Sequence, residues 1–215
     1  TAVAAGNNSF ALGTNSIANG SDAITIGRNA KTEDSTATQS IVIGANSSVG
    51  KATAQSIAIG SGNDVNEGAI VNGDQSIAIG GNVKVDGHAA VAIGGDDARK
   101  AAGIQVTYTN TNDKEVTGSL QTAVQNLTGY NISLYRGTTA SHAGVAYGTS
   151  AIAGNAGVAI GTASDSMTRK DDKGNTINNK PVTNAVAIGT GARANFDNSV
   201  AIGGGSNTDH YATKQ

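Results

Sequence analysis

The residue types that usually perform catalysis or bind metals are few in this chain, and they stand apart from one another. His88, His142 and His210 are isolated and show no His-x-x-x-His spacing, so each is interpreted as a surface or turn residue rather than a metal ligand. Asp96-Asp97 and Asp171-Asp172 do not recur in every repeat, as calcium-binding nonapeptides would. The absence of Cys excludes thiolate metal sites and thiol nucleophiles. We therefore expect no enzyme activity, no cofactor and no metal.

Phosphate-binding and nucleophile motifs are also missing from the sequence. Gly60-Ser61-Gly62 lacks the third glycine of a dinucleotide loop, and neither Gly-Lys-Ser/Thr nor Gly-x-Ser-x-Gly occurs. A formal charge of -2 with 14% charged residues gives no electrostatic basis for binding nucleic acid or an acidic membrane. No apolar run approaches the roughly 20 residues of a membrane helix. We expect any targeting segment or membrane anchor to lie outside this fragment.

Residues suited to holding a protein partner gather in one non-repetitive segment. Tyr108, Tyr130 and Tyr135 are three of the five tyrosines of the chain, and Arg136 follows directly. Tyr and Arg are favoured interface anchors because each combines apolar area with a polar tip. These four residues are the candidate partner-binding residues. The alternative is that they form a small core of their own segment or rest on the neighbouring structure.

The elements that must position these residues come from a repeat that fills most of the chain. A short apolar strand ends in glycine ten times, and the closing glycines stand 14 residues apart three times. A short unit at a nearly fixed period predicts a stacked array, in which each unit buries its apolar face against its neighbours. The ten copies are Phe10-Ala11-Leu12-Gly13, Ile24-Thr25-Ile26-Gly27, Ile41-Val42-Ile43-Gly44, Ile57-Ala58-Ile59-Gly60, Ile77-Ala78-Ile79-Gly80, Val91-Ala92-Ile93-Gly94, Val145-Ala146-Tyr147-Gly148, Val158-Ala159-Ile160-Gly161, Val186-Ala187-Ile188-Gly189 and Val200-Ala201-Ile202-Gly203.

One repeat predicts one coil of a flat parallel β-roll of about 14 residues per coil. The branched residues of Ile-Ala-Ile fall on one face of a strand and the alanine on the other. Asn, Ser or Gly two places after the strand favours a turn, because these residues tolerate left-handed backbone. The small residues that follow, as in Gly13-Thr14-Asn15-Ser16-Ile17-Ala18, then form a second short strand.

The alternation of bulky and small residues also predicts a subunit interface. If the bulky face fills the roll, the flat alanine face can approach another chain closely. So thin a core stabilises a single chain weakly, and oligomerisation would supply the missing burial. The candidate interface residues are Ala78, Ala92, Ala159, Ala187 and Ala201.

Together, the strand-Ala-strand-Gly unit and the Gly-x-Asn-Ser-x-Ala turn resemble the head repeat of YadA-like trimeric autotransporter adhesins. Among these, the sequence looks most like the ubiquitous surface protein A adhesins of Moraxella. The resemblance covers residues 6–94 and 144–206, and it implies a left-handed, homotrimeric β-roll on a bacterial cell surface. It further implies an outer-membrane anchor in a C-terminal region absent from this fragment, and a role in virulence. Asn198-Ser199-Val200-Ala201-Ile202-Gly203 matches only half of the family's collagen-binding motif.

Departures from the repeat define the expected domain organisation. Repeats occupy residues 1–94, an insertion with a hairpin and a short helix occupies 95–143, and repeats resume over 144–206. A polar loop at 162–184 interrupts this second part. It is interpreted as a solvated loop, and the alternative is a charged rim that speeds encounter with a partner. Residues 207–215 are interpreted as the approach to the family's neck.

Three functions are compatible with such an array. The favoured one is an adhesin head that binds host extracellular matrix proteins or cell-surface receptors, with fibronectin or laminin preferred. The second is a structural spacer that holds a binding region elsewhere in the protein away from the cell. The third, a trimeric acyltransferase, is disfavoured because the period is not a hexapeptide and no histidine recurs with the repeat.

Overall fold

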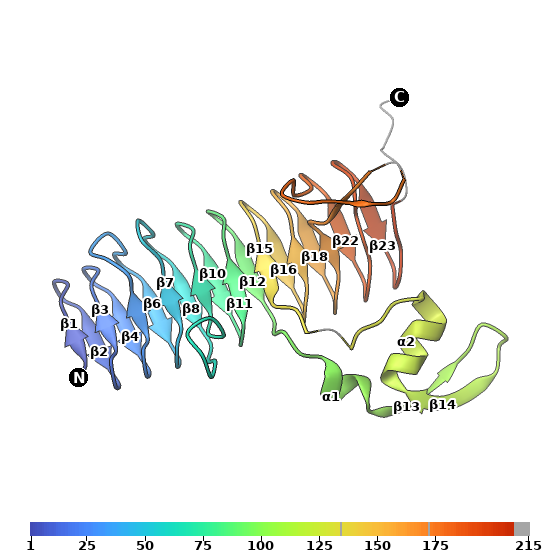
Figure 1. Cartoon of the computed structure of the whole chain (residues 1–215), viewed down its shortest axis with the longest axis horizontal. Helices are drawn as coiled ribbons and strands as arrows, with labels where there is room; N and C mark the ends of the chain where they lie inside the picture. The colour runs from blue at the N-terminus through green and yellow to red at the C-terminus, as the bar shows by residue number, and fades with distance from the viewer. Residues whose placement is uncertain (134, 172, 209–215) are drawn as a thin grey trace.

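Ten three-residue strands stack in parallel into one long sheet, and each is one of the ten apolar segments of the repeat. The computed structural model describes residues 1–208 except Leu134 and Asp172. The strands pair in chain order, so the predicted parallel β-roll is confirmed, and Figure 1 shows it as an elongated array. The strands are β2 (Phe10–Leu12), β4 (Ile24–Ile26), β6 (Ile41–Ile43), β8 (Ile57–Ile59), β10 (Ile77–Ile79), β12 (Val91–Ile93), β16 (Val145–Tyr147), β18 (Val158–Ile160), β22 (Val186–Ile188) and β23 (Val200–Ile202).

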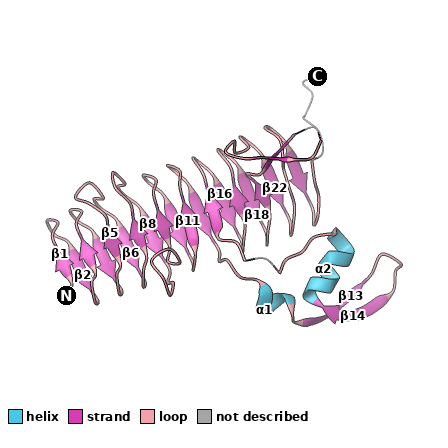
Figure 2. Cartoon of the chain, in the orientation of Figure 1, coloured by secondary structure: helices cyan, strands magenta, loops and turns pink. Residues whose placement is uncertain are grey.

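The second strand of each coil joins a sheet of nine strands that lies opposite the first. Both sheets are parallel, and the strands of the two sheets alternate along the chain through most of the roll, whose length Figure 2 shows. The second sheet consists of β1 (Val3–Ala4), β3 (Ile17–Ala18), β5 (Lys31–Thr32), β7 (Ser48–Val49), β9 (Ile70–Val71), β11 (Val83–Val85), β15 (Thr138–Ala140), β17 (Ile152–Ala153) and β19 (Asp165–Ser166).

The register of the roll is constant although the length of a coil is not. Ile77 pairs with Val91, 14 residues on, whereas Ile57 pairs with Ile77, 20 residues on. The typical spacing is about 16 residues rather than 14. Extra residues are accommodated in the turns, because a slip of one residue in a strand would turn its buried side chains outward.

The turns show why Asn and Gly recur after each strand. Asn15, Asn29 and Asn46 have φ angles of 56°, 57° and 61°, the left-handed region that Asn tolerates best among residues with a side chain. The Asn29 amide also donates to Asn46 Oδ1 at 2.8 Å, which links two coils. Gly27 has a φ of +133°, and a Cβ there would lie 2.7 Å from the carbonyl carbon of Gly44. Stacked turns therefore require glycine at the strand end.

Small side chains fill the interior of the roll, which corrects the predicted assignment of the strand faces. In β8, β10 and β12 the middle alanine is buried and its two neighbours are half-exposed. Ala78 and Ala92 are 0% exposed in the single chain and belong to the core cluster. Ala159, Ala187 and Ala201 are likewise buried, so all five predicted interface alanines lie inside the single chain rather than on its surface. A coil of two short strands encloses only enough space for such residues, which leaves isoleucine outside.

The insertion between β12 and β15 forms a separate small unit beside the roll (Figure 1). It contains helix α1 (Arg99–Ala102), strands β13 (Gln105–Thr109) and β14 (Glu115–Ser119), and helix α2 (Leu120–Thr128). The predicted hairpin and short helix are confirmed. The spacing of Val116, Leu120, Val124 and Leu127 by four, four and three residues predicts one face of a helix. The helix begins at Leu120, however, and Val116 lies in β14 instead.

The second interruption is shorter than the sequence indicated. β19 lies inside the expected loop 162–184, and Val182 is also buried against the last coils. The part that projects contains a small antiparallel hairpin of β20 (Arg169–Lys170) and β21 (Thr176–Ile177). Residues 209–215, most of the predicted approach to the neck, lie outside the described residues.

Candidate functional site

The insertion owes its shape to local capping and turn chemistry. Asn110 Oδ1 accepts hydrogen bonds from the amides of Asn112 and Lys114 at 2.9 and 3.1 Å, which closes the hairpin turn. Ser119 Oγ accepts from the Thr122 amide at 3.1 Å and caps α2. Gly129, with a φ of 71°, ends the helix in left-handed backbone. These contacts position the residues that sequence reasoning selected for partner binding.

Tyr108 is held within the insertion. It is half-buried in β13, and its hydroxyl accepts a hydrogen bond of 2.7 Å from the Asn126 side chain on α2. This bond joins the hairpin to the helix. The contact favours the alternative in which Tyr108 belongs to the small core of its own segment.

Tyr130 lies against the roll rather than away from it. The guanidinium of Arg193 is 4.2 Å from the centre of the Tyr130 ring, a cation–π contact. Gly191 makes room for the ring, because a Cβ there would lie 2.5 Å from Tyr130 Cγ. The insertion therefore leaves the roll after β12 and returns to touch coils near its C-terminal end.

Arg136 and Tyr135 stand where the chain re-enters the roll, and they differ in exposure. Arg136 donates to the Ser150 carbonyl oxygen at 2.6 and 3.2 Å and lies 3.5 Å from the buried Asp165 carboxylate. Tyr135 is 55% exposed and carries the Arg99 guanidinium 5.1 Å from its ring centre. Of the four candidate residues, Tyr135 is thus the one whose side chain is most available to a partner.

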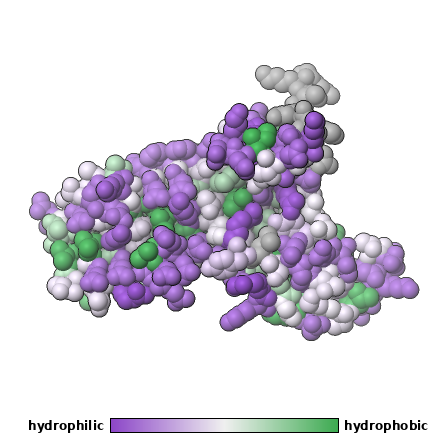
Figure 3. Space-filling model, viewed as in Figure 1, coloured by the Kyte–Doolittle hydropathy of each residue, from purple (hydrophilic) through white to green (hydrophobic). Residues whose placement is uncertain are grey.

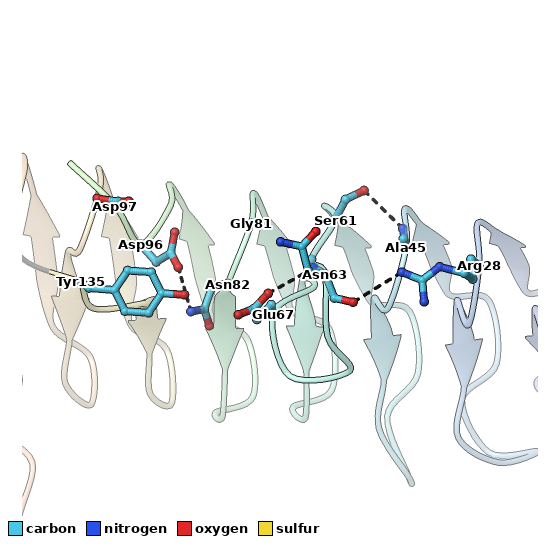
Figure 4. Close-up of a pocket in the computed structure, with 11 residues that line it drawn as sticks. Arg28, Ala45, Ser61, Asn63, Glu67, Gly81, Asn82, Asp96, Asp97 and Tyr135 are labelled. Carbon is cyan, nitrogen blue, oxygen red and sulfur yellow. Dashed lines mark hydrogen bonds between the residues drawn. The ribbon is translucent and has the colours of Figure 1, made fainter. Parts of the chain in front are cut away.

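A polar groove of about 470 Å³ lies beside Tyr135, along the turns of the roll (Figure 4). Glu67 lines one side of the groove, and Asn82, Asp96 and Tyr135 line the other. Asn82 Nδ2 donates to Asp96 Oδ2 at 3.0 Å. A hydrogen bond to the Asp96 carboxylate raises the pKa of Tyr135. Sequence reasoning did not identify the groove, because its lining comes from five successive turns of the roll and from Tyr135.

The outer face of the ten-stranded sheet carries a double row of apolar side chains, which are exposed in some coils and half-exposed in the others. Monomeric proteins rarely expose contiguous apolar surface of this kind. Figure 3 shows one face of the molecule, where hydrophobic side chains form small groups among predominantly hydrophilic ones. The most exposed members of the double row are Phe10, Leu12, Ile24, Val145, Tyr147, Ile160, Val200 and Ile202.

The two described histidines act as turn acceptors. His88 Nδ1 accepts from the Asp74 amide at 2.9 Å, and His142 Nδ1 accepts from the His88 amide at 3.2 Å. Their rings stack with centres 5.3 Å apart. The interpretation as turn residues is confirmed for both, and His210 lies outside the described residues. Within the described part of the chain, no group of three or more His, Asp or Glu side chains is placed to hold a metal ion.

Four stretches of the chain match a known protein family, described as YadA head domain repeat (2 copies): residues 4–30, 67–82, 72–96 and 183–206. All four fall on coils of the roll. The matches support the head of a trimeric autotransporter adhesin, a surface-exposed class of protein, and together with the β-roll they point to a structural, non-enzymatic role. No curated protein matches the chain. Neither helix in the described residues has the length and apolar character to cross a membrane.

Proposed function

We propose that the chain is the head of a bacterial adhesin that assembles as a homotrimer and binds host extracellular matrix proteins, fibronectin or laminin first among them. The matches to the YadA head domain repeat on coils at both ends of the roll carry this proposal. Within this class, the ubiquitous surface protein A adhesins of Moraxella are the kind we propose as nearest. The parent protein would then reach the outer membrane through a C-terminal region outside this fragment.

The outer apolar face of the ten-stranded sheet is the proposed contact between subunits. It is continuous over ten coils, and its strands keep one register from β2 to β23. Two further copies of the chain can cover this face. When three chains pack around one threefold axis with these faces turned inward, each face is covered by the other two chains and none is left to bind a fourth. A thin core of alanine and valine gains stability from that additional burial.

The insertion is the proposed site of host recognition. It is non-repetitive, projects beside the roll and exposes Tyr135, whereas the coils repeat one pattern. Three copies on one trimer would give three equivalent sites, and therefore avidity on a surface. The competing function is a structural spacer, in which the insertion binds nothing.

Binding of the purified chain to immobilised fibronectin and laminin tests this function. The matched variant replaces residues 96–136 with a short Gly-Asn link, which removes the insertion and keeps β15 in the roll. We expect both proteins to have the same oligomeric mass and only the intact chain to bind. If the intact chain binds neither matrix protein, recognition of these two ligands is excluded and the spacer function is favoured.

A further inference from the structure

One edge of the hairpin in the insertion is an unpaired β-strand. Among the residues that the structure describes, β13 pairs with β14 alone, in an antiparallel ribbon of two strands. At one end of the ribbon the Asn110 amide donates to the Lys114 carbonyl at 2.9 Å, and at the other the Leu120 amide donates to the Ile104 carbonyl at 2.7 Å. In an antiparallel ladder, bonded residue pairs alternate with non-bonded pairs. The positions with odd numbers in β13 therefore direct their backbone groups away from β14.

These outward positions are Gln105, Thr107 and Thr109, and all three are exposed. Their amides and carbonyls form a row along one side of the ribbon, with the spacing that an additional strand would pair with. The neighbouring strand β14 offers a poorer edge. Its last residue, Ser119, caps α2, and its first, Glu115, is charged.

β13 also lacks the features that normally protect an edge strand from pairing. Natural edge strands carry proline, a bulge or charged side chains, or they are covered by another element. The segment Gln105–Thr109 contains no proline and no charged residue, and its register with β14 is unbroken over five pairs. Figure 2 shows the hairpin beside α2 on the part of the insertion that projects from the roll.

We propose that the outer edge of β13 receives an extended segment of the matrix protein as a third strand of the ribbon. The inference rests on the proposed host-binding function and names the mode of recognition. Main-chain hydrogen bonds to the three outward residues would supply affinity, as in other cases of strand addition. Thr107 and Thr109 present hydroxyls on one face of the ribbon, which suits a segment with small or polar residues at alternate positions.

A pair of proline variants tests the edge without breaking the ribbon. Thr107→Pro removes an outward amide of β13, and Thr117→Pro removes an outward amide of β14. Thr107 and Thr117 are register partners whose hydroxyls bond at 3.1 Å, so both variants lose that bond as well. Proline is tolerated on an edge whose amide faces solvent. The two proteins therefore differ in which edge is blocked.

Binding to immobilised fibronectin and laminin is measured for the intact chain and both variants, after circular dichroism has shown equal melting. We expect Thr107→Pro to weaken binding about tenfold or more, since it removes a hydrogen bond and obstructs its neighbours, and Thr117→Pro to bind like the intact chain. If the intact chain binds and Thr107→Pro binds equally well, strand addition at β13 is excluded while host binding stands. If the intact chain binds neither protein, both proposals fail for these ligands.

Amide hydrogen exchange on the intact chain gives a second readout that does not depend on variants. The amides of Gln105, Thr107 and Thr109 should exchange freely without ligand and become protected when the matrix protein is bound. Protection already present in the free trimer would show that another subunit pairs with this edge, which would overturn the proposal.

Discussion

Replacing Ala78 with leucine should destabilise the roll, because the methyl group of Ala78 lies between the two sheets. Ala78 is 0% exposed and has Ala58 and Ala92 as its register partners in the adjacent strands. Strands in a sheet are held about 4.8 Å apart, so the larger side chain cannot be relieved by lateral movement. Overpacking of a core costs about 1–3 kcal/mol. We expect the upper end here, about 3 kcal/mol, and for a chain of this length a melting temperature lower by about 6–12 °C.

The assay is thermal unfolding followed by circular dichroism at two protein concentrations, which separates folding from subunit association. Ala101→Leu is the control, because it makes the same change at an exposed position of α1, outside both the core of the roll and the proposed subunit contact. It should change the melting temperature little. Equal melting of Ala78→Leu and the unmodified chain would refute the assignment of alanine to the interior and restore the opposite assignment of faces.

Three further substitutions test, one each, a turn glycine, the contact of the insertion with the roll, and an ion pair. Gly44→Ala should prevent normal folding, since φ is +112° and a Cβ would lie 1.6 Å from the Gly60 carbonyl oxygen; soluble yield and melting temperature report this. Tyr130→Ala removes the ring that stacks on a guanidinium of the roll, and it should speed proteolysis within the insertion without changing the melting of the roll. Hydrogen bonding from Arg99 lowers the pKa of Asp97 to about 2. A lowered pKa stabilises the fold above the ordinary value near 4, and this stabilisation is lost as pH falls through 2. Asp97→Asn removes the carboxylate, so at this exposed site it should lower the melting temperature slightly and equally at pH 5 and pH 8, and the difference from the unmodified chain should vanish near pH 2.

The sequence predicted the roll well because its signal is repeated ten times. Each apolar segment became a strand of the same sheet, in the same order, with the closing glycine at the turn. Turn residues such as Asn15 and Asn29 were recognisable because left-handed backbone selects few residue types. In the insertion, the alternation of Val106 and Tyr108 predicted the first strand of the hairpin, and the spacing of Leu120, Val124 and Leu127 predicted the helix. Val116 continues the same spacing but lies in β14.

The face assignment failed because alternation alone does not say which side is inside. A bulky face normally marks a core, but the space within so small a coil admits alanine, serine and valine. The signal that would have corrected the face assignment lies in the second strands, where small residues such as Ala18 and Ala153 again occupy buried positions. The contact of Tyr130 with Gly191 and the groove beside Tyr135 depend on turns far apart in sequence, and no local pattern predicts them.

The central claim is that three copies of the chain associate through the outer apolar face of the ten-stranded sheet, and the molar mass in solution tests it most directly. Light scattering on the purified chain should give three times the 21.2 kDa of one chain. A variant with Ile77→Asp and Ile93→Asp, two outer-face positions in neighbouring strands, should give the mass of one chain or a mixture that dissociates on dilution. A mass of 21.2 kDa for the unmodified chain, or an undiminished trimer for the variant, would contradict the account.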